Sequence, residues 1–422
     1  MNHRLGSDGI RAVLADIDPR VLVQHAATDP SAVASLVEPW IAVAGSIEGA
    51  LDFEALVAES PDDPVEVAVG MEDVCLLPHT SGTTGPPKGV MLTHANLTWN
   101  ALNFLSCADF RSGDVTVAIA PFFRVGGTGV NVLPVLFMGG TVVVPSDLRP
   151  DAVLQAMQRH RVTVGFGNPD LLAALASSET WPQVDLSSLR FVVTGGAPVP
   201  ERLIRAWLDR GVLLLQGYGL SEAAPLALLL DPTSALAKIG SAGRPPLLVD
   251  IQIVHPDGTV AGPGETGELL VRGPNVMAGY WRRPEATSEV LSADGWLRTG
   301  DAARSDEQGY VWIVDRMADC FLSDGRPVYP GDVERVMTSH PSVADAGVVQ
   351  LLADGAGEVV ALVVLSAGSK ATEQEILAYA RQHLAAHQAP TSVMFVDRLP
   401  RNTVGKLLRA QLPALISPPT PA

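Results

Sequence analysis

The amino-acid sequence predicts an α/β protein, and three patterns along the chain support this fold class. Between residues 140 and 215, short apolar strands alternate with amphipathic helices, which is typical of a parallel sheet covered by helices on both faces. Around residues 249–253, apolar residues alternate with polar ones, as in a half-buried antiparallel sheet. Beyond residue 319, the pattern of helices and strands predicts a compact α+β unit of about a hundred residues.

The length and the charge limit the classes of protein to which the chain can belong. Its 422 residues suggest about two or three domains, and the 47% of hydrophobic residues supply material for their cores. The formal net charge of −17 argues against an electrostatic grip on an anionic membrane or on nucleic acid, because either would require a basic face. We therefore expect no nucleic-acid partner.

The cysteines and the apolar segments predict a soluble protein of the cytoplasm. Cys75, Cys107 and Cys320 are far apart and odd in number, so they indicate neither a disulfide framework nor a metal site. The N-terminus has no apolar segment of the kind that secretory signals contain. The most apolar stretch, residues 130–144, is interrupted by Asn131, Pro134 and a glycine pair, and it is shorter than the ~20 apolar residues of a membrane span.

The strongest local motif is the segment 79–90, which reads HTSGTTGPPKGV. It places three glycines, four hydroxyl side chains and Lys88 between two apolar runs. Glycines let backbone N–H groups turn toward an anion, hydroxyls add donors and the lysine adds a charge, so the segment suits a polyphosphate. Its spacing differs from that of the GxxxxGK[ST] phosphate loop. On composition alone, a surface turn rich in Ser, Thr and Gly is the alternative.

The segments on either side of this motif differ in how much they predict. Residues 1–70 carry no motif: 12–23 and 31–43 suggest short helices or strands, and 61–64 a loop. After the motif, the apolar spacing predicts a helix over 93–105 and a fully apolar strand over 115–120. The strand leads into Pro121-Phe122-Phe123-Arg124-Val125-Gly126-Gly127. Its arginine among aromatic residues and glycines is unusual, although such a side chain often only extends its head to solvent.

The alternating region predicts strands at 141–144, 162–166, 191–194 and 212–215. The helices between them have apolar faces that contain Val153, Leu154, Met157, Leu203, Ile204, Trp207 and Leu208. Ligands of parallel sheets bind beyond the carboxyl ends of the strands. Two glycine-rich segments, 195–198 and 216–222, follow such ends, so we expect both to line a binding site.

The rest of the chain predicts a second domain. Antiparallel strands are expected at 249–253, 268–272 and 310–314, and a domain boundary at 316–319 divides the chain into 1–316 and 317–422. The second unit is expected to contain helices at 332–339 and 373–387 and strands near 348 and at 359–365. Its polar segment 399–406 ends in Lys406, for which an ordinary surface lysine is the default interpretation.

The order of these pieces resembles the adenylate-forming superfamily, which includes acyl-CoA synthetases, aryl-CoA ligases, firefly luciferase and the adenylation domains of nonribosomal peptide synthetases. The match is dense from Asp73 to the C-terminus. The resemblance implies a large N-terminal domain of parallel α/β sheets plus a small β-barrel, hinged to a small, mobile α+β C-terminal domain. It also implies that residues 1–72 form a shorter leader than is usual in this family.

The resemblance further implies ATP, Mg²⁺ and CoA as ligands and assigns a role to each motif residue. The phosphates of ATP would be held by Thr80, Ser81, Gly82, Thr83, Thr84, Gly85 and Lys88. The adenine would be surrounded by Gly195, Gly196, Ala197, Pro198, Gln216, Gly217, Tyr218 and Gly219. The remaining expected contacts are Ser221 with the α-phosphate, Glu222 with Mg²⁺, Asp301 and Arg316 with the ribose, Lys406 with the α-phosphate and the acyl carboxylate, and Gly325 with pantetheine. The carboxylic acid would lie near Phe122, Phe123, Arg124, Gly126 and Asn168.

Three residues depart from the pattern of the family. Arg124 stands where its acyl- and aryl-CoA ligases generally have histidine, and this arginine could meet the distal anion of a dicarboxylic acid. Ala318 occupies a hinge position where Lys or Asp is usual. Asp324 replaces one glycine near the expected path of pantetheine, where its charge would repel the phosphates of CoA.

We therefore expect an enzyme that uses ATP to convert a carboxylic acid into an acyl-adenylate and then forms a thioester with CoA. One alternative is an acyl-AMP ligase that loads the phosphopantetheine of an acyl carrier protein or another nucleophile. A second alternative, of a different class, is a nucleotide-binding protein with weak catalysis. The presence of Lys88, Glu222, Asp301, Arg316 and Lys406 argues against the second alternative.

Overall fold

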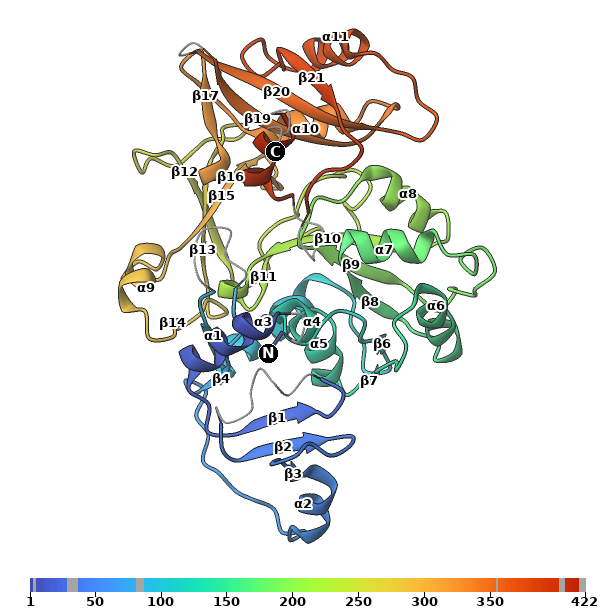
Figure 1. Ribbon diagram of the computed structural model, residues 1–422, viewed down its shortest axis with the longest axis vertical. Coiled ribbons are helices and arrows are strands. Elements are labelled where there is room, and N and C mark those ends of the chain that lie inside the picture. The colour runs from blue at the N-terminus through green and yellow to red at the C-terminus, as the bar shows by residue number, and fades with distance from the viewer. Residues whose placement is uncertain (3–4, 29–36, 81–86, 354–355, 402–406, 417–422) are drawn as a thin grey trace, which may run out of the picture.

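The computed structural model describes residues 1–2, 5–28, 37–80, 87–353, 356–401 and 407–416. Figure 1 shows a small N-terminal sheet at one end of the long axis, a large sheet flanked by helices in the middle and the C-terminal segment at the other end. The α/β fold class is confirmed, since a parallel sheet, antiparallel sheets and helices are all present.

A six-stranded sheet in the order β11-β10-β9-β8-β6-β7 forms the centre of the molecule. Its parallel strands are β6 (Val115–Val117), β7 (Thr141–Val143), β8 (Val164–Gly167), β9 (Phe191–Gly195) and β10 (Leu213–Gly219), and β11 (Leu226–Leu229) adds an antiparallel edge. The predicted strand over 115–120 was too long, because β6 ends at Val117. Just beyond it, the Ala118 amide still donates a hydrogen bond to the Val143 carbonyl of the neighbouring strand at 2.9 Å.

Helices cover both faces of this sheet, as the alternation of strands and helices predicted. One face packs against α6 (Pro150–Arg159), α7 (Pro169–Ala176) and α8 (Glu201–Leu208), and the other against α3 (His94–Cys107) and α5 (Val132–Phe137). Successive strand residues alternate between the two cores: Val192 belongs to the first, whereas Phe191 and Val193 belong to the second. The short helix α4 (Val125–Gly129) lies between β6 and α5 along the chain.

Two antiparallel sheets share a further core. The first contains β12 (Asp250–Val254), β13 (Gly267–Arg272), β15 (Leu297–Ser305) and β16 (Val311–Arg316), and the second contains β4 (Val74–Leu76), β5 (Val90–Thr93) and β14 (Gly279–Tyr280). The helix α9 (Pro284–Val290) and the 3₁₀ turn η2 (Ser221–Ala223) pack nearby.

The C-terminal segment has its own hydrophobic cores. Its elements are η3 (Met317–Asp319), β17 (Phe321–Ser323), β18 (Arg326–Val328), α10 (Pro330–Thr338), β19 (Val343–Ala353), β20 (Ala356–Leu365), α11 (Glu373–His383), β21 (Ser392–Phe395), η4 (Arg409–Gln411) and α12 (Pro413–Ile416). The predicted helix over 373–387 ends early, because the backbone is already extended at Leu384. The division of the chain into domains at residue 316 stays a prediction.

The N-terminal segment forms a small unit of its own. It contains α1 (Ser7–Ile17), the parallel strands β1 (Leu22–His25), β2 (Trp40–Val43) and β3 (Leu51–Asp52), and α2 (Phe53–Glu59). Leu14 and Trp40 anchor its core. Among the described residues of the whole chain, every helix is too short or too polar to span a bilayer.

The buried carboxylate of Asp114 ties together the amino ends of three parallel strands. It accepts hydrogen bonds from Arg190 Nη1 and Thr163 Oγ1, both at 2.7 Å, and these two residues immediately precede β9 and β8. The backbone amide of Arg111 donates a third hydrogen bond. Burial would raise the pKa of Asp114, but the hydrogen bonds from Arg190, the Arg111 amide and Thr163 lower it overall.

We predict that Asp114→Ala lowers the free energy of unfolding at pH 7 by about 2–3 kcal/mol, because Arg190 and Thr163 lose a charged acceptor. Since the folded-state pKa is lowered, this stabilisation is fully present above the unfolded pKa of about 3.9 and disappears as the pH falls through the folded value. Denaturant titration at several pH values measures the difference. The control is Asp147→Ala, which breaks the exposed contacts with the side chain and the backbone amide of Arg149 and should cost much less than Asp114→Ala. Equal losses in the two variants would contradict the prediction.

Candidate active site

The carboxyl ends of β9 and β10 meet at one edge of the parallel sheet, where the sequence predicted a binding site. Gly195 pairs with Gly217 in register, and the strands approach so closely there that a Cβ on Gly195 would lie 2.4 Å from the Gly217 carbonyl oxygen. A Cβ on Gly219 would lie 1.9 Å from the Pro225 carbonyl oxygen. Only glycine fits at these positions, so a narrow strip of glycine backbone, which we call the glycine floor, lies at the two strand exits.

The other predicted residues of these exits lie around this floor. Gly196 adopts a φ of 85°, and it is exposed together with Pro198, whereas Ala197 is half-buried. Gln216 is buried, and its Nε2 has no hydrogen-bond partner within the described part of the chain. A buried donor of this kind next to a binding floor is available to a ligand.

Tyr218, Asp301 and Arg316 come together from three different strands. The Tyr218 hydroxyl donates to Asp301 Oδ2 at 2.5 Å, and Arg316 Nη1 lies 3.0 Å from Asp301 Oδ1. Thr299 Oγ1 accepts a hydrogen bond from the Asp301 amide. Burial, and then the charge of Asp301, raise the pKa of Tyr218 far above its ordinary value. The tyrosine therefore stays a neutral donor and fixes the carboxylate.

A second tyrosine holds the second predicted carboxylate. Tyr280 of β14 donates its hydroxyl to Glu222 Oε1 at 2.8 Å, and Glu222 lies in η2 directly after Ser221. The ammonium of Lys88 lies 4.9 Å from the centre of the Tyr280 ring, a distance at which cation and ring attract each other. Burial and the Glu222 charge raise the pKa of Tyr280. Lys88 and Glu222, predicted to act on the same nucleotide, are thus joined by one side chain.

The two ends of the predicted phosphate-binding segment are held together. The Thr80 amide donates to the Lys88 carbonyl at 3.0 Å, and His79 and Gly89 form an antiparallel bridge. Five predicted phosphate ligands, Ser81, Gly82, Thr83, Thr84 and Gly85, lie outside the described residues, and so does Lys406.

The residues predicted to contact the acid lie at the start of α4 and the end of β8. Arg124 is the N-cap of α4, and its guanidinium lies 5.9 Å from the centre of the Phe123 ring. Gly126 faces the ring of Phe166, which a Cβ would approach to 3.4 Å. Asn168 caps α7 by accepting the Leu171 amide at 3.0 Å, so it has a structural task that the sequence did not reveal. Phe122 is about half exposed.

Gly325, predicted near pantetheine, lies at the tip of the hairpin between β17 and β18. Asp324 and Gly325 form its two-residue turn with φ values of 52° and 71°. Both residues are exposed, and a Cβ on Gly325 would touch nothing within 4 Å. Two positive φ values are typical of a tight hairpin turn, in which aspartate is well tolerated.

Glu222 fits a magnesium ion that arrives with a nucleotide. Among the described residues, no group of three or more His, Cys, Asp or Glu side chains is arranged to hold a metal by itself. Mg²⁺ is commonly bound by one or two carboxylates together with the phosphates of its substrate. A single oriented carboxylate beside Lys88 agrees with this second mode of binding.

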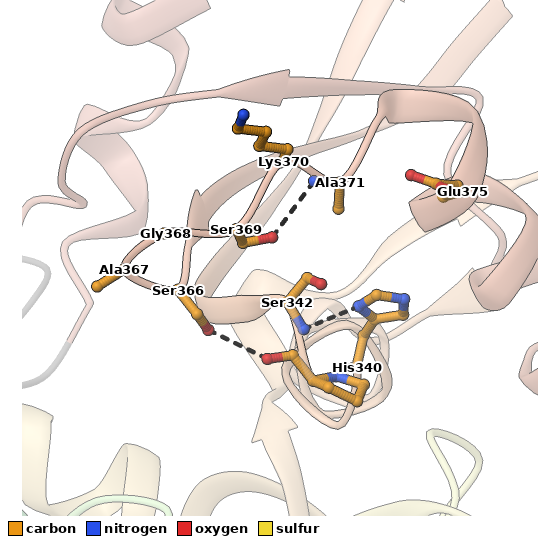
Figure 2. A pocket seen from close by; sticks show the side chains of 10 residues that line it. His340, Ser342, Ser366, Ala367, Gly368, Ser369, Lys370, Ala371 and Glu375 are labelled. Carbon is orange, nitrogen blue, oxygen red and sulfur yellow. Dashed lines mark hydrogen bonds between the residues drawn. The ribbon is translucent and has the colours of Figure 1, made fainter.

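An open pocket of about 590 Å³ lies elsewhere, in the C-terminal segment, between residues 340–342, residues 366–371 and Glu375. Figure 2 shows hydrogen bonds between residues that line it: Ser366 Oγ donates to the Pro341 carbonyl, and the Ser342 amide donates to His340 Nδ1. None of the predicted site residues lines it, and we assign it no role.

Tyr280 is the site residue that the sequence analysis missed. It was overlooked because it follows a glycine in a two-residue strand far from the predicted motifs, and only the pairing of β14 with β5 brings it to Glu222.

Comparisons with known proteins agree with this geometry. A family model described as "AMP-binding enzyme" matches residues 1–281, and one described as "AMP-binding enzyme C-terminal domain" matches residues 332–406. A feruloyl-CoA synthase from Amycolatopsis sp is 43% identical over 415 residues, which cover 98% of this chain and 82% of that protein.

Two solved structures extend the comparison. The anthranilate CoA ligase in complex with anthranoyl-AMP has a TM-score of 0.88 at 28% identity, covering 98% of this chain and 82% of its own. The o-succinylbenzoate coenzyme A synthetase of Bacillus subtilis, in complex with ATP and a magnesium ion, has a TM-score of 0.83 at 31% identity, covering 98% and 83%. The chain therefore belongs to the AMP-binding enzyme family and is an AMP-forming acid–CoA ligase.

Proposed function

We propose that this ligase activates an aromatic carboxylic acid and transfers the acyl group to CoA. The observation that carries the proposal is the convergence of Tyr218–Asp301–Arg316 and Tyr280–Glu222–Lys88 at the carboxyl ends of β9 and β10. The names of the three relatives support an aromatic acid, since they refer to feruloyl, anthranoyl and succinylbenzoate groups. The ring of Phe166 against Gly126 and the neighbouring Phe123 offer flat apolar surfaces for such a substrate.

In this proposal the nucleotide lies across the glycine floor. Asp301 accepts the ribose hydroxyls, and Arg316 and Tyr218 fix its position. We assign the phosphates to Thr80 and Lys88, whose backbones are hydrogen-bonded, and to the sequence between them, Ser81, Gly82, Thr83, Thr84 and Gly85. Glu222, held by Tyr280, would bind Mg²⁺, which neutralises phosphate charge when present.

The first step joins two anions. A carboxylate oxygen of the acid attacks the α-phosphorus, an acyl–phosphate bond forms, and pyrophosphate leaves with its electron pair. We assign Lys406 to the charge that develops on the α-phosphate, with Ser221 as a hydroxyl donor. In the second step the thiol attacks the acyl carbonyl and AMP leaves. The names of the relatives favour CoA over a carrier protein as the thiol donor.

The direct test is a screen of acid-dependent pyrophosphate release with purified protein. Aromatic acids, straight-chain fatty acids and short aliphatic acids are each assayed with ATP and Mg²⁺, without acceptor, with CoA or with a phosphopantetheinylated carrier protein. We expect pyrophosphate release with aromatic acids and a thioester only with CoA. A preference for aliphatic acids would overturn the substrate class, and acylation of the carrier protein in preference to CoA would overturn the acceptor.

We predict that Lys406→Ala reduces acid-dependent pyrophosphate release by about 10²–10³-fold, because the variant lacks a preorganised charge at the phosphate. ATP binding, measured by calorimetry, should change by less than about twofold, since the charge acts mainly in the transition state. Lys370→Ala is the matched control, because this lysine belongs to the same C-terminal segment but lies at the unrelated pocket. Undiminished release by the Lys406 variant would remove this residue from the mechanism.

We predict that Tyr218→Phe weakens AMP binding about fivefold, the value of one hydrogen bond, because Asp301 loses the hydroxyl that orients it. The raised pKa of Tyr218 keeps the hydroxyl protonated well beyond the ordinary tyrosine pKa of about 10, so the deficit should be constant between about pH 6 and 9. Calorimetric titration with AMP across this range measures it. Tyr310→Phe, which loses a hydroxyl bonded to Asp231 elsewhere, is the control. A deficit that changes with pH would contradict the interpretation.

We predict that Arg124→His changes the preference between aromatic acids with and without a second carboxylate. The guanidinium lies 5.9 Å from the centre of the Phe123 ring, beside the residues proposed to contact the acid, so an anionic substituent near it would gain a charge-assisted contact. The ratio of kcat/KM for the dicarboxylic over the monocarboxylic acid should fall about tenfold, which corresponds to 1.4 kcal/mol. Arg159→His on the exposed end of α6 is the control. An unchanged ratio of kcat/KM would show that Arg124 does not contribute to selection of the acid.

A further inference from the structure

The end of α1 lies beside the neck of the phosphate-binding segment, which we define as residues 79–80 and 88–89. Asp16, in the last turn of α1, is only 13% exposed at its side chain. Its carboxylate has two partners on opposite sides: Oδ2 lies 3.3 Å from His79 Nε2, and Oδ1 accepts Arg283 Nη2 at 2.6 Å. Its backbone carbonyl accepts Trp281 Nε1 at 3.2 Å. One residue of the N-terminal helix thus contacts two distant segments.

Both of these segments belong to the neck or brace it. His79 forms a bridge with Gly89, and its ring would lie 3.2 Å from a Cβ on Gly89, so ring and backbone are in close contact. The Trp281 amide donates to the Gly89 carbonyl at 2.8 Å. Asp16 therefore holds one end of the neck through His79 and the other end through Trp281.

We propose that Asp16 is a positioning residue for the triphosphate of ATP, acting through His79 on the separation of Thr80 and Lys88. This inference rests on the proposed role of Thr80 and Lys88 at the phosphates. If Thr80 and Lys88 are already fixed before ATP binds, less conformational entropy is lost on binding. The affinity for ATP is therefore higher. The ion pair with Arg283 keeps the Asp16 carboxylate from turning away, so its second oxygen stays directed at the imidazole.

A purely structural role would be to dock α1 onto the rest of the protein. The small core of the N-terminal unit, in which Leu14 packs with Leu22, Val37 and Trp40, already attaches α1 to its neighbours in sequence. The two roles differ in what they predict for ligands. Loss of docking alone lowers stability and affects all nucleotides alike, whereas loss of the neck affects only nucleotides with a β- and a γ-phosphate.

The experiment compares Asp16→Ala with the parent in calorimetric binding of AMP and of a non-hydrolysable ATP analogue with Mg²⁺. We expect the affinity for the ATP analogue to fall about tenfold, because His79 at the neck loses its contact with the carboxylate. The affinity for AMP should change by less than about twofold, because AMP has no β- or γ-phosphate to meet the neck. Asp16→Asn, which keeps an acceptor oxygen, should give an intermediate loss. Asp18→Asn is the matched control: it removes a negative charge at the same helix end, where Asp18 is 78% exposed and lies 3.6 Å from Arg282, and asparagine tolerates the φ of 51° at this position.

His79→Phe completes the test, because the inference requires Asp16 to act through the imidazole. The single variants and the double variant should show the same loss of ATP-analogue affinity. Equal losses for AMP and the analogue, or additive losses in the double variant, would overturn the inference and leave Asp16 as an anchor of α1. Thermal melts identify any variant that is not folded. If Asp16→Ala is not folded, the binding measurements on Asp16→Asn test the inference in its place. Failure of the proposed function would be seen separately, as absence of acid-dependent pyrophosphate release in the parent protein.

Discussion

Five residue pairs join β9 to β10 in parallel, from Phe191 with Leu213 to Gly195 with Gly217, and the position of the candidate site follows from this register. Because parallel strands end at the same edge of a sheet, the two glycine-rich exits must lie side by side. In this register a Cβ on Gly195 would lie 2.4 Å from the Gly217 carbonyl oxygen, so the close approach of the two strands requires glycine. The order of the strands thus places the glycine floor at one edge of the sheet. Tyr218 belongs to the second of the two exits, and Glu222 comes three residues after its last glycine.

The site uses two neutral tyrosines to hold two carboxylates, and the surroundings of the two pairs differ. Asp301 also forms an ion pair with Arg316. Its charge is thereby compensated, which suits a carboxylate that accepts hydrogen bonds from neutral hydroxyl groups. No cation forms an ion pair with Glu222 within the described residues, so its charge is available to a metal that comes with the nucleotide. A tyrosine fixes the orientation of a carboxylate without cancelling its charge, because burial keeps the phenol protonated. The same residue type thus orients both the carboxylate that we propose for the ribose and the carboxylate that we propose for Mg²⁺.

The departures of this chain from its family have unequal physical weight. At the hairpin tip, Asp324 takes a positive φ that aspartate tolerates, so replacing glycine there costs the turn little. Any effect of Asp324 on CoA would therefore come from its exposed side chain, through bulk or charge, and not from strain in the turn. Arg124 is different, since it caps α4 and its guanidinium lies over an aromatic ring at the proposed acid pocket. In the proposed acid pocket, this second change would alter the chemistry that a substrate meets.

The sequence by itself determined the α/β class, the strands that carry the glycine-rich exits and the membership of the superfamily. These properties are local: the alternation of apolar residues sets strands and helices, and the glycines mark where backbone must approach backbone. For this reason Gly195, Tyr218 and Glu222 could be named in advance. Element ends were less predictable, as for the helix that ends at His383, because the last turn depends on packing.

Only the tertiary structure decided which distant residues act on these motifs. Tyr280 reaches Glu222 through the pairing of β14 with β5, and Asp16 reaches His79 because α1 folds back over the neck. Asn168 was expected at the acid, and the structure shows that it also caps a helix. Contacts of this kind have no periodicity or spacing in the chain, because they arise where separate elements pack together. Sequence patterns report what a segment forms, and packing decides which segments meet.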